Sequence, residues 1–164
     1  MIKVLFIFII TLLLTSSACA FQFEDNKWGS PFEGVYDTLK AGKHDIERGE
    51  YYIKYEDAIF GKSCYVKFFF TPQTKLLAKI LIEWKENDIG VQIKKEIIKK
   101  YGPPNKGDNM LTQFFWEEGR SAEDERMVFS YGPALPATLN YYGGIYWRKF
   151  QEEGGKLFRP IPFL

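Results

Sequence analysis

Three consecutive stretches of the chain alternate apolar and polar residues with a period of two, and this pattern constrains the fold more than any other feature. The stretches are Tyr51–Asp57, Cys64–Phe70 and Ala78–Lys85. Successive side chains of a β-strand point to opposite faces of a sheet, so each stretch predicts a strand with one buried and one solvated face. Turn-forming segments around Gly61 and over residues 71–75 separate them. The sequence therefore predicts a three-stranded antiparallel meander.

The alternation also assigns one face of the meander to the core. The residues expected to point inward are Tyr51, Ile53, Tyr55, Cys64, Val66, Phe68, Phe70, Ala78, Ile80, Ile82 and Trp84. On this interpretation Cys64 is a small buried apolar residue. A catalytic role would require a base near the thiol, and nothing in the sequence links Cys64 to the single histidine, His44.

A short helix is predicted before the meander. Its apolar stripe recurs at i, i+3, i+4 and i+7, and the stripe consists of Phe32, Val35, Tyr36 and Leu39. Ser30 is expected as the N-cap, Pro31 as the first helical residue and Glu33 as the residue that completes an S-x-x-E capping box. Gly42 is expected to end the helix.

A second helix is predicted over Ile89–Tyr101, with Asp88 as its N-cap. Its apolar stripe consists of Ile93, Ile97, Ile98 and Tyr101, and Gly102-Pro103-Pro104 is expected to end it. Strands are then expected at Leu111–Glu118, Asp124–Tyr131 and Thr138–Tyr142. Residues 145–153 have helical spacing and predict a terminal helix, and a hairpin turn at residues 143–144 is the alternative.

The element order is therefore helix, three strands, helix, three strands. We expect an α+β fold in which two helix-then-three-strand units, residues 28–87 and 88–153, form an antiparallel sheet with the helices packed on one face. A single domain over residues 21–164 accommodates both units.

The first 20 residues have the organisation of a secretory signal peptide. Lys3 forms a short positive region, residues 4–14 are an almost uninterrupted apolar run, and the small residues 18–20 (Ala-Cys-Ala) follow. A membrane span needs about 20 apolar residues, so the run is too short for a transmembrane segment. We expect cleavage after Ala20 and export to the periplasm of a Gram-negative bacterium. A lipid anchor on Cys19 is the alternative, although the residues before it match the lipoprotein pattern poorly.

Charge and motif content argue against several classes of function. Lys and Arg number 22 against 21 Asp and Glu, and the first 20 residues contribute only Lys3, so the remaining chain is neutral. A neutral chain lacks the basic surface that nucleic-acid binding requires. The sequence contains no nucleophile elbow, zinc-ligand spacing, phosphate-binding loop or dinucleotide fingerprint. We therefore expect no enzyme activity, no metal and no cofactor.

Two short motifs and the order of elements carry a resemblance to known proteins. The motifs are Ser30-Pro31-Phe32-Glu33 and Lys100-Tyr101-Gly102-Pro103-Pro104. Over residues 28–150 the chain resembles small exported bacterial proteins that are similar to the β-lactamase-inhibitor-protein-like superfamily and to the outer-membrane-assembly lipoproteins of the BamE/SmpA type. The resemblance implies helix-then-meander units. It carries no catalytic or ligand residue over to this chain.

The sheet face opposite the helices is the candidate functional surface. The alternation places Tyr52, Tyr65 and Phe69 on it among charged residues that include Lys67. Aromatic rings interleaved with charges are typical of protein-binding surfaces. We therefore predict a non-enzymatic module that binds another envelope protein through these four residues.

Two alternatives to this interpretation remain open at the level of sequence. The terminal segment, residues 157–164, could cover the open face and leave it without a partner. The chain could also be a small-ligand-binding protein or a hydrolase-like enzyme with a pocket between the sheet and the helices. A wide, shallow aromatic surface favours the binding module, and a deep pocket lined by convergent polar groups favours the alternative function.

The mass of the exported protein tests the processing prediction. If the signal peptide is cleaved after Ala20, intact-mass spectrometry of the exported protein gives the mass of a chain that begins at Phe21. A mass that includes diacylglycerol on Cys19 would contradict this prediction and place the protein at a membrane surface.

Overall fold

The computed structural model describes residues 26–107, 113–117, 124–133 and 135–155. The predicted signal peptide and residues 157–164 lie outside these ranges. The helices are α2 (Phe32–Ala41), α3 (Gly90–Tyr101) and α4 (Gly144–Glu152). The strands are β1 (Ile46–Arg48), β2 (Tyr52–Ile59), β3 (Lys62–Phe70), β4 (Leu77–Asn87), β5 (Lys106–Gly107), β6 (Gln113–Glu117), β7 (Arg126–Gly132) and β8 (Leu135–Tyr142).

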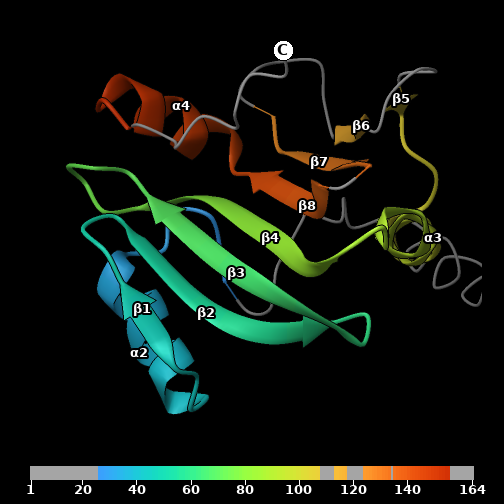
Figure 1. The fold of residues 1–164 in the computed structure, drawn as a ribbon. Helices are drawn as coiled ribbons and strands as arrows, with labels where there is room; N and C mark the ends of the chain where they lie inside the picture. The colour runs from blue at the N-terminus through green and yellow to red at the C-terminus, as the bar shows by residue number, and fades with distance from the viewer. Residues whose placement is uncertain (1–25, 108–112, 118–123, 134, 156–164) are drawn as a thin grey trace, which may run out of the picture.

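The strands of the described residues form one antiparallel eight-stranded sheet in the order β1-β2-β3-β4-β8-β7-β6-β5 (Figure 1). The first four strands run across the sheet in chain order and the last four in reverse order, so β4 and β8 meet in the middle. Helices and an antiparallel sheet confirm the predicted α+β class.

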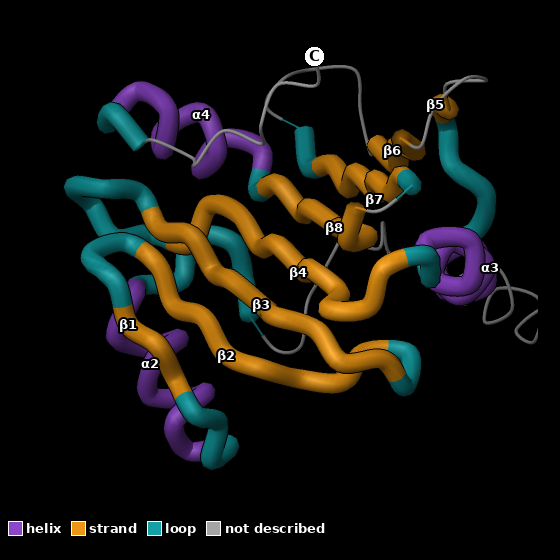
Figure 2. Tube along the Cα trace, in the orientation of Figure 1, coloured by secondary structure: helices purple, strands orange, loops and turns teal. Residues whose placement is uncertain are grey.

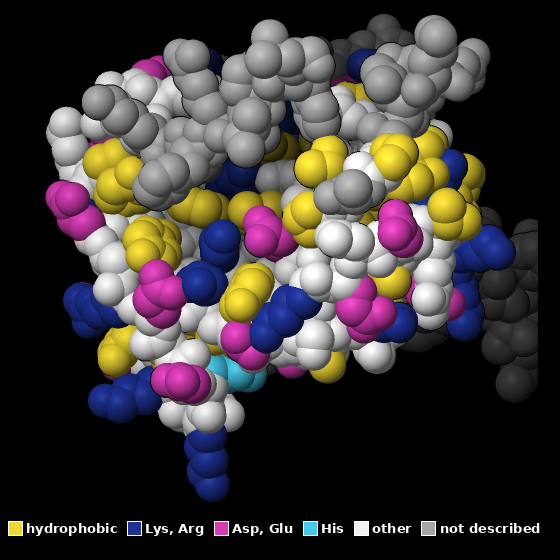
Figure 3. Space-filling model, viewed as in Figure 1, with side chains coloured by type: hydrophobic (Ala, Val, Ile, Leu, Met, Phe, Trp, Pro, Cys, Tyr) yellow, Lys and Arg dark blue, Asp and Glu magenta, His cyan; other side chains and the backbone are white. Residues whose placement is uncertain are grey.

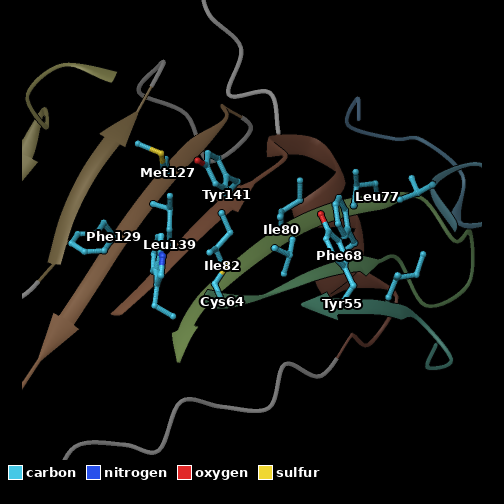
Figure 4. Packing of buried hydrophobic residues seen from close by; sticks show 14 of the residues in the cluster. Tyr55, Cys64, Phe68, Leu77, Ile80, Ile82, Met127, Phe129, Leu139 and Tyr141 are labelled. Carbon is cyan, nitrogen blue, oxygen red and sulfur yellow. The ribbon is translucent and has the colours of Figure 1, made fainter. Parts of the chain in front are cut away.

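The main core lies on one face of this sheet, as the alternation predicts. Cys64, Val66, Phe68 and Phe70 of β3 are fully buried there, and Figure 4 shows buried side chains of β2, β3, β4, β7 and β8 gathered on this face. Two helices contribute apolar side chains to the same cluster, namely Phe32, Val35 and Leu39 of α2 and Ile93 and Ile97 of α3. In Figure 2, β1 crosses in front of α2, so the viewer looks onto the opposite face of the sheet.

The third helix does not share this face, which corrects the expectation that all helices pack on one side. Trp147 and Phe150 of α4 form a second, smaller cluster with Ala78, against which Phe69 and Tyr142 pack. Phe69 and Tyr142 alternate with the inward-facing Phe68 and Tyr141, so the cluster lies on the other face of the sheet. The helical spacing of residues 145–153 correctly predicts a helix but contains no information about which face it covers.

The end of α4 is attached to the turn between β3 and β4. The carboxylate of Glu153 accepts hydrogen bonds from the backbone N–H of Gln73 (2.7 Å), the backbone N–H of Thr74 (3.1 Å) and the hydroxyl of Thr74 (2.8 Å). Desolvation raises the pKa of Glu153, but these hydrogen bonds outweigh it and lower the pKa below its usual value. The contact fixes the C-terminal end of the helix against a turn far away in sequence.

A register shift at the start of β4 changes the predicted inward set. Phe69 pairs with Lys79 and Phe70 with Leu77, so Ala78 is an extra residue in this strand. Leu77 therefore occupies the core position next to Phe70, and Ala78 contacts the α4 cluster. Tyr51, which is also predicted to point inward, packs in the α4 cluster as well, with its ring centroid 6.0 Å from that of Phe150. Beyond the shift, Ile80, Ile82 and Trp84 face the main core as predicted.

Helix α2 begins one residue later than predicted and without a capping box. Pro31 is the N-cap, and it forms an isolated β-bridge with Leu76. The N–H of Phe32 donates to the carbonyl of Lys75 at 2.9 Å, so the loop before β4 satisfies a backbone donor that a capping side chain would otherwise serve. Glu33 instead forms an ion pair with Arg48 of β1 at 2.5 Å.

Helix α3 also begins later than predicted. Its N-cap is Ile89, and no side-chain hydrogen bond caps it, because Asp88 has a positive φ of 63° and belongs to the turn that leaves β4. Its end follows the prediction. Gly102 has a φ of 81°, a conformation that favours glycine, and its carbonyl accepts a 2.9 Å hydrogen bond from the indole of Trp116.

The structure contains two short strands that the sequence does not predict, and β8 is longer than predicted. β1 pairs with β2, and β5 pairs with β6, over too few residues for a period of two to be visible in the sequence. β8 begins at Leu135, three residues before the predicted start of this strand at Thr138. Pro136 lies opposite Asn87, beyond the point where the regular pairing of β4 with β8 ends.

Truncation of a core ring tests the placement of the core face. Phe68 is fully buried, so Phe68→Ala is expected to lower the free energy of unfolding by roughly 3–5 kcal/mol through lost burial and a cavity. Val91 is 56% exposed, and Val91→Ala is the matched control with an expected change within about 0.5 kcal/mol. Urea denaturation measures both, and equal midpoints for the two variants would show that Phe68 is not a core residue.

Candidate functional site

The candidate site is the sheet face opposite the main core, which we call the outer face. Strand register arranges its side chains in three rows across the sheet. The first row, nearest to α4, contains Tyr52, Phe69, Lys79, Tyr142, Arg126 and Glu117. The middle row contains Lys54, Lys67, Leu81, Asn140, Val128 and Phe115. The third row contains Glu56, Tyr65, Glu83, Thr138, Ser130 and Gln113.

At the β2–β3 side of the outer face, charged side chains hold two tyrosines in place. The ammonium groups of Lys54 and Lys85 lie 4.6 Å and 4.5 Å from the ring centroid of Tyr65. Lys54 also pairs with Glu47 at 2.9 Å, and the hydroxyl of Tyr52 donates to the same carboxylate at 2.7 Å. The hydrogen bonds from Tyr52 and Lys54 lower the pKa of Glu47. Exposed ion pairs stabilise a fold little, so the main effect of this network is to orient the rings.

The middle of the first row contains an enclosed lysine. The ammonium group of Lys79 lies 5.6 Å from the ring centroid of Phe69, 5.0 Å from that of Tyr142 and 5.6 Å from that of Trp147. The first two rings come from the neighbouring strands, and Trp147 comes from α4. Lys79 is only 5% exposed as a result. Ring faces attract a cation, which offsets part of the cost of removing the ammonium group from water.

The charges around Lys79 have its own sign. The guanidinium of Arg126 lies 4.7 Å from the centroid of Tyr142, the ring that Lys79 also contacts. Desolvation, followed by the charges of Arg126 and Lys67, lowers the pKa of Lys79 to about 8. Within the described ranges, none of these three cations forms an ion pair with a carboxylate. Glu117 lies opposite Arg126 in the first row but forms its ion pair with Lys106, so among the described residues the charge at these three cations is not paired.

The structure places all four predicted site residues on the outer face, in two different settings. Tyr52 and Tyr65 are half-buried within the ionic network, and Lys67 lies in the middle row between them and Lys79. Phe69 does not lie on the open part of the face, because it packs beneath α4 in the second cluster. Truncation of Phe69 would therefore disturb the packing of α4.

Sequence reasoning places Lys79 on the solvated side of the sheet but does not identify it as a functional residue. Its strand partner Tyr142 and the next residue of the row, Arg126, are contributed by pairings between β4, β8 and β7 that are distant in sequence. Trp147 is recognisable only as part of a helical stripe. The one available signal is that the alternation of Ala78–Lys85 sets Lys79 on the same face as Phe69 and Lys67.

Cys64 has the surroundings of a structural thiol. Its sulfur contacts the carbonyl of Asp57 at 3.5 Å, and burial raises the pKa of the thiol to about 11. A thiol at this pKa is protonated at neutral pH and is a poor nucleophile. His44 lies against the ring of Tyr55, with 4.4 Å between the ring centroids. The contacts of the two residues give no support to a catalytic pair.

Figure 3 shows basic, acidic and apolar side chains interleaved on the outer face. In the part of the chain that the structure describes, no group of three His, Cys, Asp or Glu side chains is arranged to hold a metal ion. None of the helices in the same ranges has the length and apolar character needed to cross a membrane.

Comparison of the chain with protein-family models, curated proteins and solved structures finds no match. A functional proposal must therefore rest on the chemistry of this face.

The pH dependence of stability tests the environment of Lys79. A folded-state pKa of about 8, below the ordinary value of 10.5, means that the unfolded chain binds more protons than the folded chain between these values. Stability contributed by this group therefore rises as the pH rises through this window. Between pH 7 and pH 9.5 the wild type is expected to gain about 2 kcal/mol in free energy of unfolding relative to Lys79→Met.

Urea denaturation of both proteins at the two pH values measures this difference. Because tyrosines and other lysines titrate in both proteins, their contributions to the free energy of unfolding cancel in the comparison. If the stabilities of wild type and Lys79→Met change in parallel with pH, the ammonium group is hydrated and the enclosure by the three rings is wrong.

Proposed function

We propose that this protein is a non-enzymatic binding module of the bacterial envelope, exported to the periplasm, that binds another envelope protein through the outer face. The observation that carries the proposal is the arrangement of the face itself. Two tyrosines, Tyr52 and Tyr65, are held by hydrogen bonds and cation–ring contacts on a sheet surface. Residues of the first row of this surface pack against α4. The proposal also extends the resemblance to exported helix-plus-meander proteins.

Pre-oriented aromatic side chains are suited to protein recognition. Tyr65 is half-buried, and the two lysines over its ring restrict the positions that it can adopt. An aromatic ring with few accessible rotamers loses little conformational entropy when a partner covers it. Tyrosine, tryptophan and arginine are also the residues most often found as binding hot spots. The composition of the outer face, with Tyr52, Tyr65 and Arg126, supports this use.

The dimensions of the face support the same conclusion. Three rows across six strands cover roughly 30 Å by 20 Å at ordinary strand and residue spacings. This area is on the order of the 800 Å² that each partner contributes to a standard protein interface. A rigid antiparallel sheet can present such a surface without rearrangement.

The space between the sheet and the two helices of the main core favours binding over the alternative enzyme. The side chains there, from α2, α3 and the inner face of the sheet, are mostly buried and apolar, and the hydroxyls of Tyr101 and Tyr141 hydrogen-bond to each other at 2.9 Å. Convergent polar groups of the kind that a small-ligand site needs are located on the outer face instead.

Truncation of Tyr65 tests the proposal. Affinity capture with the tagged mature protein from its own periplasm, followed by mass spectrometry, identifies the partner. The affinity of that partner is then expected to fall by about 2 kcal/mol or more for Tyr65→Ala, while the free energy of unfolding changes by about 1 kcal/mol or less.

The matched control is Tyr36→Ala. Tyr36 is also a half-buried tyrosine with two cations over its ring, Lys40 at 5.9 Å and Arg48 at 4.9 Å, but it belongs to α2 on the other side of the sheet. This variant is expected to bind the partner normally. A folded Tyr65→Ala protein that retains full affinity for every captured partner would refute binding through this surface.

A further inference from the structure

The basic side chains of the outer face fall into two groups with different surroundings. Those at the margins are paired with acids, namely Lys54 with Glu47, Lys85 with Glu56 and Lys106 with Glu117. Those in the interior of the face are Lys67, Lys79 and Arg126, and among the described residues none of them has an acidic partner within ion-pair distance. We call these three residues the cation triad.

Two members of the triad lie against the same aromatic ring. Lys79 and Arg126 occupy strands on either side of Tyr142, two strand spacings or about 10 Å apart at the backbone. The charged ends of both residues lie against the ring of Tyr142, at 5.0 Å and 4.7 Å from its centroid. Lys67 lies on β3 opposite Leu81, which puts it one row from Lys79 on the same face. Three positive charges therefore converge on one area of the sheet.

Among the described residues, the positive charge of Lys79 has no acidic side chain as an ion-pair partner. Lys79 is 5% exposed, and its neighbours are cations and ring faces. A buried charge without a counter-charge destabilises a fold, and an apolar residue of similar shape at the same position would not have this cost. A negatively charged group brought to the triad would remove the cost and gain favourable Coulomb energy.

We propose that Lys79, Lys67 and Arg126 form an anion-binding site that takes a carboxylate group of the protein partner bound to the outer face. This inference rests on the proposed function and specifies the chemistry of the partner, which presents an acidic residue to the first row of the sheet.

The nearly buried ammonium group of Lys79 forms no ion pair with any of the described residues. Arg126, which lies against the same ring of Tyr142, is exposed. A carboxylate that binds the guanidinium of Arg126, whose planar donors fit carboxylate geometry, is thereby placed next to Lys79 and counters its charge.

Short peptides supply a defined probe. We would measure the binding of N-acetyl-triglutamate amide and N-acetyl-triglutamine amide to the mature protein by calorimetry at constant ionic strength. The wild type is expected to bind the triglutamate peptide at least tenfold more tightly. In Lys79→Met this preference is expected to disappear, and in Arg126→Gln, at an exposed position, it is expected to fall severalfold.

Lys95→Met is the matched control, because Lys95 is an exposed lysine on α3, away from the outer face. It is expected to retain the full preference for triglutamate. Near-ultraviolet circular dichroism verifies that each variant is folded, and Lys79→Gln replaces Lys79→Met if the latter is not. Equal binding of the two peptides to the wild type, or an undiminished preference in folded Lys79 variants, would overturn the proposal.

The pH dependence of binding provides a readout that a purely structural lysine would not change. The groups that face Lys79 are the cations Lys67 and Arg126 and the phenol of Tyr142, whose pKa is raised by burial. Lys79 loses its proton as the pH rises through about 8. The preference of the wild type for triglutamate is therefore expected to decline between pH 7 and pH 9.5, and a constant preference over this range would exclude Lys79 from the site.

Two further arms identify the anion and separate this inference from the proposed function. If inorganic phosphate competes in a Lys79-dependent manner and triglutamate does not bind, the site takes phosphate and the carboxylate assignment is wrong. If neither probe depends on Lys79 while Tyr65→Ala still weakens partner binding, the anion site is wrong and the proposed function stands. If triglutamate binds through Lys79 but Tyr65→Ala binds every partner normally, the proposed function fails and the anion site remains.

Discussion

The antiparallel pairing of β4 with β8 is the interaction on which the rest of the structure depends. Each strand is the inner edge of a four-stranded half, and their pairing joins the halves into one sheet. On the inner face it sets Ile80 opposite Tyr141 and Ile82 opposite Leu139, which makes the core continuous across the sheet. On the outer face the same register sets Lys79 opposite Tyr142. A shift by one residue would exchange these two sets of side chains between the faces.

The position of α4 follows from this pairing. The helix begins directly after β8, and the N–H of Gly143 donates to the carbonyl of Ala78 at 2.9 Å. A Cβ atom at Gly143 would lie 2.6 Å from the ring of Trp28, so only glycine allows the chain to turn this closely beside the N-terminal segment. Trp147 then lies over Lys79, and Glu153 reaches the turn between β3 and β4. The enclosure of the lysine is thus a consequence of how two strands meet.

Much of this fold is predictable from the sequence because its strongest signals are local. The period-two pattern identifies the inward face of β3 and most of β4, and the glycine-proline run correctly ends α3. The helix starts are less accurate, since the sequence rule assumes that a side chain satisfies the first backbone donors. At α2 the loop before β4 supplies the acceptor instead. The face covered by α4 and the enclosure of Lys79 depend on pairings between distant strands, about which local periodicity contains no information.

The same strand order has a consequence for the way the chain folds. Residues 88–134 separate β4 from β8, so the central strand pair can form only by closing a long loop, which costs conformational entropy. The meander β2-β3-β4 can form from segments that are neighbours in sequence. The pairing of β4 with β8 joins distant segments, and folds dominated by distant pairings form slowly. Until β8 arrives, β4 is an unprotected edge strand with a strongly apolar inner face, and such edges invite pairing with other chains. The period of greatest aggregation risk is therefore the interval between the folding of the two halves, and mutations that weaken β8 would prolong it without changing any residue of the first half.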